Sequence, residues 1–427
     1  MRPTARLLVL ALASFVVSAV AMALGEGARA IAPWLWLPLM GALGADLALS
    51  LGRPVSLAAT APDEVFTGQT VTLMLTPSHR PPGLTARFDW PEGLSGPADA
   101  RLDQGPSTAV PMTGRRRGKW TVEALWLSWT SRLGLIEFVP RLALDLTIAA
   151  VPDIRPVQSG AIDVKVRSTL FGVKENFARG EGSEFHQLRD FMQGMDTRSI
   201  DWKHSARHLQ LVAKEMRAER NHHVIVALDN GYLMRAEVGG LPKIDHAVNA
   251  ALVTAWAAGV GGDLVGLYAY DERPRLFVPP EPGRLAFARL RARTAELSYR
   301  GVETNHTLAM ASLVARTPRR SLVIVFSDFV DATSAELMVE NMAAIARRHV
   351  LVFVAIRDPA VERLATAEPG DVDAMATAVA AGGLMAERRL VMEKLSRLGI
   401  VVIDAAPGQV SARVVSTYLD LKAREAA

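Results

Sequence analysis

Two carboxylates and one hydroxyl occupy positions in the sequence where a metal ion could be bound. Asp229 follows the apolar run 224–228, Asp328 comes soon after the run 321–326, and Thr304 lies in a loop just before an expected helix. The carboxyl ends of parallel strands meet at one edge of a sheet, and ligands bind beyond that edge. Oxygen donors that converge from separate loops suit Mg²⁺, a hard cation. Asp229, Thr304 and Asp328 are therefore our candidate metal ligands.

A densely charged segment, residues 165–220, holds a second set of candidates. Basic residues slightly outnumber acidic ones there, and Phe185, Phe191 and Trp202 are interleaved with the charges. Mixed charge is often no more than a solvated surface, but interleaved apolar residues can be buried and so hold the charges in fixed positions. We expect eight side chains of this segment to bind a partner: Glu184, Arg189, Asp190, Asp196, Arg198, Asp201, Trp202 and Arg207.

Residue type and spacing exclude several catalytic chemistries. The 427 residues include no cysteine, which rules out thiolate metal sites, disulfides and cysteine nucleophiles. His204 and His208 have metal-ligand spacing but no acidic partner in a zincin pattern, and Gly114 and Gly118 lie too close together for a phosphate-binding loop. The chain also lacks a nucleophile elbow and a His-Glu-x-x-His motif. We therefore expect that the protein is not an enzyme.

The metal candidates depend on elements that alternate between strand and helix from residue 221 to 427. Apolar runs predict buried strands, and the stretches between them have helical character. This alternation predicts a doubly wound parallel sheet with helices on both faces. The expected strands are 224–228, 264–270, 321–326, 350–356 and 400–403, and the expected helices are 244–260, 284–297, 308–315, 335–348, a long stretch ending at 398 and a closing helix to about 424.

Residues 54–155 have a different character, with short β-rich runs separated by Gly and Pro clusters. In the run 120–129, alternation places Trp120, Val122 and Ala124 on one face. No helical stripe of useful length appears there. We expect a small antiparallel β-sandwich, with strands at about 70–75, 84–90, 120–129 and 142–151.

The first 53 residues predict a transmembrane hairpin. Two long apolar runs, 7–24 and 30–51, are separated by a short loop, and each is long enough to cross a bilayer. They account for much of the positive mean hydropathy of +0.17. Arginines lie outside the two runs, whereas the loop carries little net charge. The positive-inside rule therefore predicts that both termini and the soluble domains are cytoplasmic.

Two features of the hairpin leave alternatives open. Residues 21–23 resemble a cleavage site, so the first run could be a signal peptide, although the second run would still bring the remainder inside. Asp46 interrupts the second run near its cytoplasmic end. A carboxylate there could be a snorkelling or capped acid, or a proton relay.

The charged segment resembles a signature of the bacterial domain-of-unknown-function-58 family. The two-helix start, the β-rich middle and the α/β end also agree with that family. The residues that carry the resemblance are Gly182-x-Glu184-Phe185, Leu188-Arg189-Asp190-Phe191, Gly194-x-Asp196-x-Arg198-x-Ile200-Asp201-Trp202 and Ser205-Ala206-Arg207.

The α/β part resembles the von Willebrand factor A-type fold, in which an Asp-x-Ser-x-Ser loop, a Thr and a second Asp hold a divalent ion. In this chain the loop begins at Asp229, and Gly231 and Leu233 stand where that pattern has serines. Two hydroxyl ligands are therefore missing, and Mg²⁺ demands a nearly complete octahedron of oxygens. The resemblance implies a degenerate site with weak or lost Mg²⁺ binding.

These observations divide the chain into a transmembrane hairpin (1–53), a β-sandwich-like domain (54–155), a charged connector (156–220) and a von Willebrand factor A-like domain (221–427). The resemblance implies a protein-interaction module of the bacterial inner membrane. Its expected partners are a MoxR-type AAA+ ATPase and other A-type membrane proteins, in envelope-related assembly or chaperone-like work. The alternatives are a structural envelope scaffold and, less expected, an enzyme with a novel site near Asp229. The net charge of +4 is too small to indicate a nucleic-acid partner.

Overall fold

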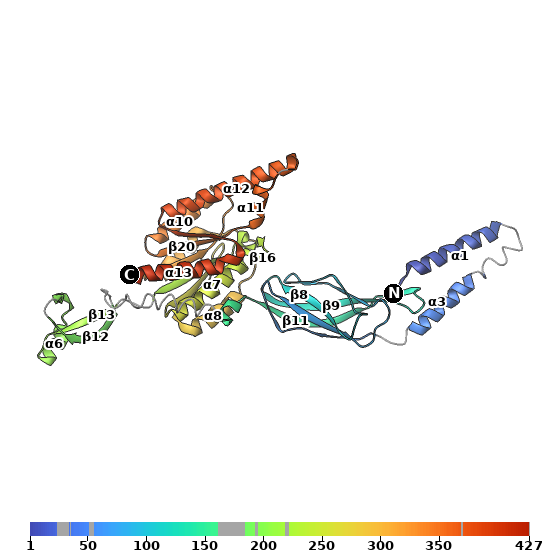
Figure 1. Ribbon diagram of the computed structural model, residues 1–427, viewed down its shortest axis with the longest axis horizontal. Helices are drawn as coiled ribbons and strands as arrows, with labels where there is room; N and C mark the ends of the chain where they lie inside the picture. The colour runs from blue at the N-terminus through green and yellow to red at the C-terminus, as the bar shows by residue number, and fades with distance from the viewer. Residues whose placement is uncertain are drawn as a thin grey trace. The chain divides into compact units, whose positions relative to one another are not determined.

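The computed structural model describes residues 1–23, 34, 36–50, 55–160, 184–192, 195–217, 222–368 and 370–426. The chain divides into two compact units, Met1–Val151 and Pro152–Ala427 (Figure 1). The first unit contains the apolar helices and the β-rich segment. The second contains the charged connector and the α/β sheet.

One helix in the described part of the chain is long and apolar enough to cross a membrane, by length and composition. This helix, α1 (Ala5–Ala23), has 19 residues and follows the short strand β1 (Arg2–Pro3). Helix α3 (Leu37–Ser50) is also apolar, but its 14 residues correspond to only about 21 Å. Most of the remainder of the second predicted span, 30–51, lies outside the described residues.

Two sheets share a core in the rest of the first unit. The larger has the order β1-β10-β9-β11-β3, with β5 paired to β9 and β7 paired to β5, and the smaller has the order β2-β4-β8-β6. Leu73 and Leu75 of β4 lie in one buried cluster with Leu125 and Leu127 of β9, so the two sheets pack face to face. The strands are β2 (Leu57–Thr60), β3 (Glu64–Phe66), β4 (Thr70–Pro77), β5 (Thr85–Phe88), β6 (Leu94–Ser95), β7 (Asp99–Arg101), β8 (Thr108–Gly114), β9 (Gly118–Thr130), β10 (Ile136–Phe138) and β11 (Arg141–Val151).

The turn between β9 and β10 binds the carboxylate of α3. Asp46 is fully buried and accepts hydrogen bonds from the backbone N–H groups of Leu133 (2.9 Å) and Leu135 (3.2 Å). The hydroxyl of Ser131 also donates to it. A buried carboxylate is stable only when protein donors replace water. Asp46 therefore has a structural role, as the link between α3 and this turn.

Six strands form the sheet of the second unit, in the order β18-β17-β14-β19-β20-β21. All neighbouring pairs are parallel except β17 and β18, which are antiparallel. The sequence did not predict β18, so the sheet is mixed rather than wholly parallel. The strands are β14 (His223–Asp229), β17 (Leu264–Tyr270), β18 (Pro274–Pro282), β19 (Leu322–Phe326), β20 (Val350–Ile356) and β21 (Val401–Ala405).

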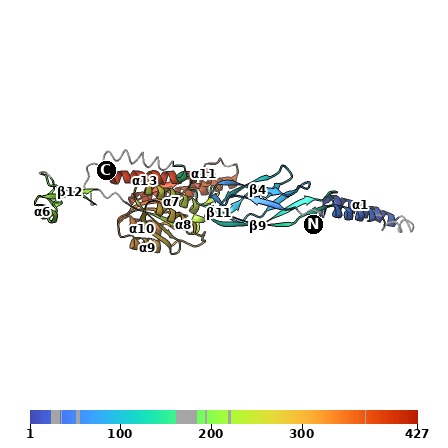
Figure 2. The same ribbon diagram turned by 90° about the horizontal axis from the view of Figure 1, so that it is seen from below.

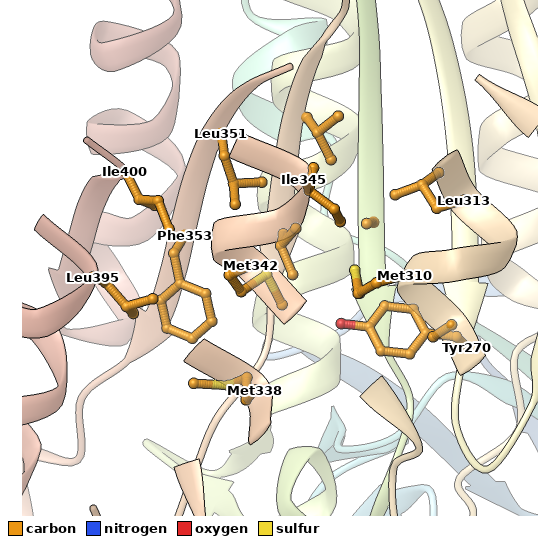
Figure 3. Close-up of a cluster of buried hydrophobic side chains, with 14 of the residues drawn as sticks. Tyr270, Met310, Leu313, Met338, Met342, Ile345, Leu351, Phe353, Leu395 and Ile400 are labelled. Carbon is orange, nitrogen blue, oxygen red and sulfur yellow. The ribbon is translucent and has the colours of Figure 1, made fainter. Parts of the chain in front are cut away.

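Helices cover both faces of this sheet (Figures 1 and 2). Ile225 and Ala227 of β14 belong to a core cluster with side chains of α9, α10 and α12 (Figure 3), whereas Val226, which is also buried, points to the opposite face. Helix α7 is buried along most of its length and packs with α8 and α13. The helices are α7 (Lys243–Val260), α8 (Gly283–Ala295), α9 (His306–Arg316), α10 (Ala335–Ala346), α11 (Pro359–Thr366), α12 (Val372–Arg397) and α13 (Val410–Ala426).

The charged connector forms a small module within the described residues 184–217. Strands β12 (Glu184–Asp190) and β13 (Val212–Arg217) pair antiparallel, and helix α6 (Trp202–His208) lies between them in sequence. The helix is preceded by a single turn of 3₁₀ helix, Thr197–Ser199. Residues 161–183, which precede β12, lie outside the described residues.

Candidate functional site

The candidate metal ligands lie where the strand order of the sheet reverses, between β14 and β19. In chain order, the strands run third, second, first, fourth, fifth, sixth across the sheet. Ligands of such sheets bind beyond the carboxyl ends of the first and fourth strands. Asp229 ends β14, and Ser327 and Asp328 directly follow β19. Thr304 reaches the same edge from the loop before α9.

Asp229 is held by three donors of the protein itself. Its carboxylate accepts hydrogen bonds from the Thr304 and Ser327 hydroxyls, each at 2.6 Å, and from the Gly231 N–H at 2.9 Å. Burial raises the pKa of Asp229 above the ordinary value, against the effect of these donors. The nearest cationic candidate, His306 Nε2, is 3.9 Å away, and burial lowers the pKa of that imidazole. Asp229 is thus a buried acid whose oxygens already have partners.

Gly231 makes the contact between Thr304 and Asp229 possible. A Cβ atom at position 231 would lie 2.0 Å from the Thr304 Oγ1 atom, far inside van der Waals contact. A serine there, as in the A-type pattern, is therefore incompatible with this arrangement. The Nδ2 of Asn230 donates to the Ser298 carbonyl at 2.8 Å, which fixes the orientation of this amide.

Asp328 is paired with two cations from distant parts of the sequence. Lys243 Nζ, at the first residue of α7, forms an ion pair and hydrogen bond with Asp328 Oδ2. Arg388 of α12 donates to Asp328 Oδ1 at 2.9 Å and to Asp404 Oδ1 at 3.1 Å. The side chains of Asp328 and Lys243 are only 4% and 12% exposed. Sequence reasoning missed Lys243, Arg388 and Asp404.

As arranged here, the residues do not fit a magnesium ion. Both oxygens of Asp229 accept hydrogen bonds from internal donors, and Asp328 faces an ammonium and a guanidinium, which would repel a divalent cation. Among the described residues, no group of three or more His, Asp or Glu side chains is placed to hold a metal. The missed hydroxyl, Ser327, had one sequence signal, its position beside Asp328 at a strand end.

The connector gives Asp201 a structural position. Its carboxylate caps α6 by accepting from the backbone N–H groups of Lys203 (3.0 Å) and His204 (3.1 Å). It also lies 3.2 Å from Lys214 Nζ on β13. The hydrogen bond from the His204 N–H lowers the pKa of Asp201 most, and the side chains of His204 and Lys214 lower it further, against the opposing effect of burial. Asp201 thus orients α6 against the strand pair β12–β13.

The other described candidates of the connector lie on its surface. Arg189, Asp190, Asp196 and Arg207 are exposed, and the Trp202 side chain, the first of α6, is 69% exposed. The side chains of Glu184 and Arg198 lie outside what the structure describes. Three exposed apolar residues were not predicted: Met192, Leu209 and Leu211. Leu209 is 92% exposed and adopts the left-handed conformation (φ 56°), which L-residues rarely accept.

Comparison with known proteins matches a family model to part of this chain. The family model described as "Protein of unknown function DUF58" matches residues 187–378. Uncharacterized proteins of Mycobacterium tuberculosis and Mycobacterium bovis are each 25% identical over 197 residues, or 46% of this chain. The match spans 61% of the length of these relatives.

Solved structures give weaker matches. The conserved hypothetical protein BatB of Bacteroides thetaiotaomicron is 16% identical, over 48% of this chain and 100% of its own, with a TM-score of 0.34. An uncharacterized membrane-spanning protein of Vibrio fischeri is 14% identical, over 47% of this chain and 98% of its own, with a TM-score of 0.17. The likeness to the DUF58 family therefore rests on the sequence match over residues 187–378, which is just under half of the chain.

Proposed function

We propose that this chain is a membrane-anchored protein-interaction module that acts by binding rather than by catalysis. Its α/β part is a von Willebrand factor A-like domain, and its partner is a MoxR-type AAA+ ATPase, together with other A-type membrane proteins. The work served is envelope-related assembly or chaperone-like remodelling at the bacterial inner membrane. The family resemblance in the charged connector supports this choice of partner.

The surface of the connector module is the observation that carries the proposal. Trp202, Leu209 and Met192 are each more than three-fifths exposed, in a module whose described residues form two strands and a seven-residue helix. A two-stranded hairpin is marginal in water, and clustered apolar exposure marks an interaction site. Exposed charges, including Arg189 and Arg207, accompany these apolar residues and would set the orientation of a partner.

The carboxyl edge of the α/β sheet supports binding over catalysis. Asp229 and Asp328 both have internal partners, so neither is positioned as a free general base. Large apolar side chains are exposed on elements that begin at the same edge: Tyr232, Leu308, Val330 and Leu337. Such residues suit a protein partner better than a small polar substrate.

The test is capture of a purified MoxR-type ATPase by the full chain in detergent micelles. Trp202→Ala should weaken capture by about tenfold or more, because truncated interface tryptophans commonly cost more than 1 kcal/mol. Trp126→Ala is the matched control, since Trp126 is also exposed but lies on β9 of the first unit. Equal capture by Trp202→Ala and the unmodified chain would show that the connector is not the docking surface. No capture by any variant would exclude this partner.

A further inference from the structure

We infer that Lys243 is a built-in replacement for the divalent cation at the carboxyl edge of the sheet. The inference does not depend on the ATPase partner, because it concerns only the internal charges of the α/β domain. It assigns a role to a residue that the metal-site pattern does not include. The edge then needs no metal ion to keep its loops in place.

The position of Lys243 is unfavourable unless it has such a role. It is the first residue of α7, where the helix dipole is positive and disfavours a cation. It is also largely buried, so it loses most of its contact with water. The carboxylate of Asp328 offsets both costs, since it is the acid paired with this ammonium. A lysine at this position is therefore best explained by the charge of Asp328.

Arg388 completes the replacement. It contacts Asp328 on the oxygen that Lys243 leaves free and bridges to Asp404 of β21. Its guanidinium also lies over the Phe329 ring, 5.4 Å from the centroid, which fixes its orientation. The ammonium and the guanidinium together carry the two positive charges that one divalent ion would bring to this edge.

The surroundings of Asp229, the other acid at this edge, are consistent with the same inference. Asp229 is held by the hydroxyls of Thr304 and Ser327 rather than by cations. In an oxygen-ligated metal site such hydroxyls would turn their lone pairs to the ion. Here they donate their protons to Asp229, so the two halves are satisfied separately and no shared cation is required.

The experiment compares the full chain with Lys243→Met in detergent micelles, in chelator and in millimolar Mn²⁺. The unmodified chain should bind no Mn²⁺ by electron paramagnetic resonance, and its Tm should not respond to the metal. Lys243→Met should have a lower Tm in chelator, because Asp328 loses one of its two cations. Mn²⁺ should then bind this variant and raise its Tm by about 2–4 °C or more. Adding Asp328→Asn to Lys243→Met should abolish both effects.

Lys422→Met is the matched control. Lys422 is paired with the buried Asp263 at 2.7 Å and is 13% exposed. It lies on α13 and has no ion pair with Asp229 or Asp328 among the described residues. This variant should be destabilised in the same way and should gain no Mn²⁺ binding.

Two results would overturn the inference. One is Asp328-dependent binding of Mn²⁺ to the unmodified chain, because the lysine would then not have replaced the ion. The other is a folded Lys243→Met chain that neither binds Mn²⁺ nor gains stability from it. If Lys243→Met does not fold, Lys243→Gln, which keeps a neutral hydrogen-bond donor toward Asp328, is titrated in its place and judged by the same results.

Discussion

At the residue scale, the arrangement of side chains at the carboxyl edge of the α/β sheet depends on the space beside Asp229. Thr304 reaches this acid only because position 231 carries no Cβ atom. The glycine therefore does more than remove a hydroxyl ligand: it opens the space in which a hydroxyl from another loop satisfies the buried carboxylate. Loss of a metal ligand and gain of an internal hydrogen bond are two consequences of one residue.

Gly231→Ser should destabilise the α/β domain, although it restores a serine of the A-type pattern. Either Thr304 gives up its hydrogen bond or the loop shifts, and overpacking of this kind costs about 1–3 kcal/mol. Urea unfolding of the full chain in micelles measures the loss. Gly370→Ser is the control, because a Cβ there would meet nothing within 4 Å, and its effect should stay within about 0.5 kcal/mol. Equal stability of the two variants would contradict the steric argument.

His349 gives the same domain a dependence on pH. This imidazole is buried, and its Nδ1 accepts a hydrogen bond from the Ser321 N–H at 3.3 Å, which requires an unprotonated nitrogen. Burial, together with Arg348 and Arg320, lowers the pKa of His349. The unfolded chain therefore takes up a proton at a higher pH than the folded chain does. Stability should be complete above the ordinary histidine pKa of about 6.5 and should fall as the pH drops below it.

His349→Asn should remove this part of the pH dependence, because the amide oxygen can accept the Ser321 hydrogen bond and does not titrate. The measurement is the free energy of unfolding in urea between pH 7.5 and pH 5.5. One proton contributes at most about 1.4 kcal/mol per pH unit. An unchanged slope in the variant would mean that other groups, such as His246, whose pKa burial also lowers, dominate this range.

At the element scale, the apolar runs predicted the central strands well, because a strand buried on both faces is almost wholly apolar. The antiparallel strand β18 was missed, since its sequence from Pro274 to Pro282 is rich in proline. An edge strand tolerates proline because one row of its N–H groups has no partner. The long helical stretch ending at 398 is two helices, because Asp358 and Asp371 each cap a new start.

The candidate site could be predicted only in part for a related reason. Residues at strand ends follow from the element pattern, so Asp229 and Asp328 were identified. Lys243 and Arg388 lie on helices, and which helix residues reach a strand end depends on how the helices pack. The sequence pattern does not contain that packing.

The link between α3 and the β9–β10 turn is a contact between elements that can be tested by one substitution. Asp46→Asn removes a charge that accepts hydrogen bonds from Ser131, Leu133 and Leu135. Hydrogen bonds to a charged group contribute about 1.5–3 kcal/mol, so the turn should open more often. Limited trypsin digestion of the full chain in micelles should cleave faster after Arg132, which lies in this turn.

Asp89→Asn is the control for this experiment, because Asp89 is exposed in the same unit. Its cleavage rate after Arg132 should equal that of the unmodified chain. If Asp46→Asn were cleaved no faster than Asp89→Asn, the buried carboxylate would not be holding the turn.

At the scale of the whole molecule, the first strand bears on how the chain crosses the membrane. Residues Arg2–Pro3 pair with β10, and Arg2 donates to both oxygens of Glu137, at 2.7 and 2.9 Å. The start of the chain and the β-rich part of the first unit must therefore lie on the same side of any membrane that α1 crosses. If α1 spans the bilayer, the chain has to cross back before residue 55. The two-span anchor expected from the sequence would meet this requirement, whereas cleavage of a signal peptide would take β1 away.

The resulting prediction concerns both ends of the anchor. Alkaline phosphatase, which is active only outside the cytoplasm, should be inactive when fused after Ala427 and active when inserted between residues 25 and 29. The positive-inside rule gives the same orientation, because Arg2 precedes α1 and Arg6 lies in its first turn. The intact mass of the membrane-extracted protein should include residues 1–4, as the β1–β10 pairing requires. A mature chain that begins near residue 24, or an active fusion at Ala427, would contradict the two-span anchor, and a mature chain without β1 would leave Glu137 without its arginine partner.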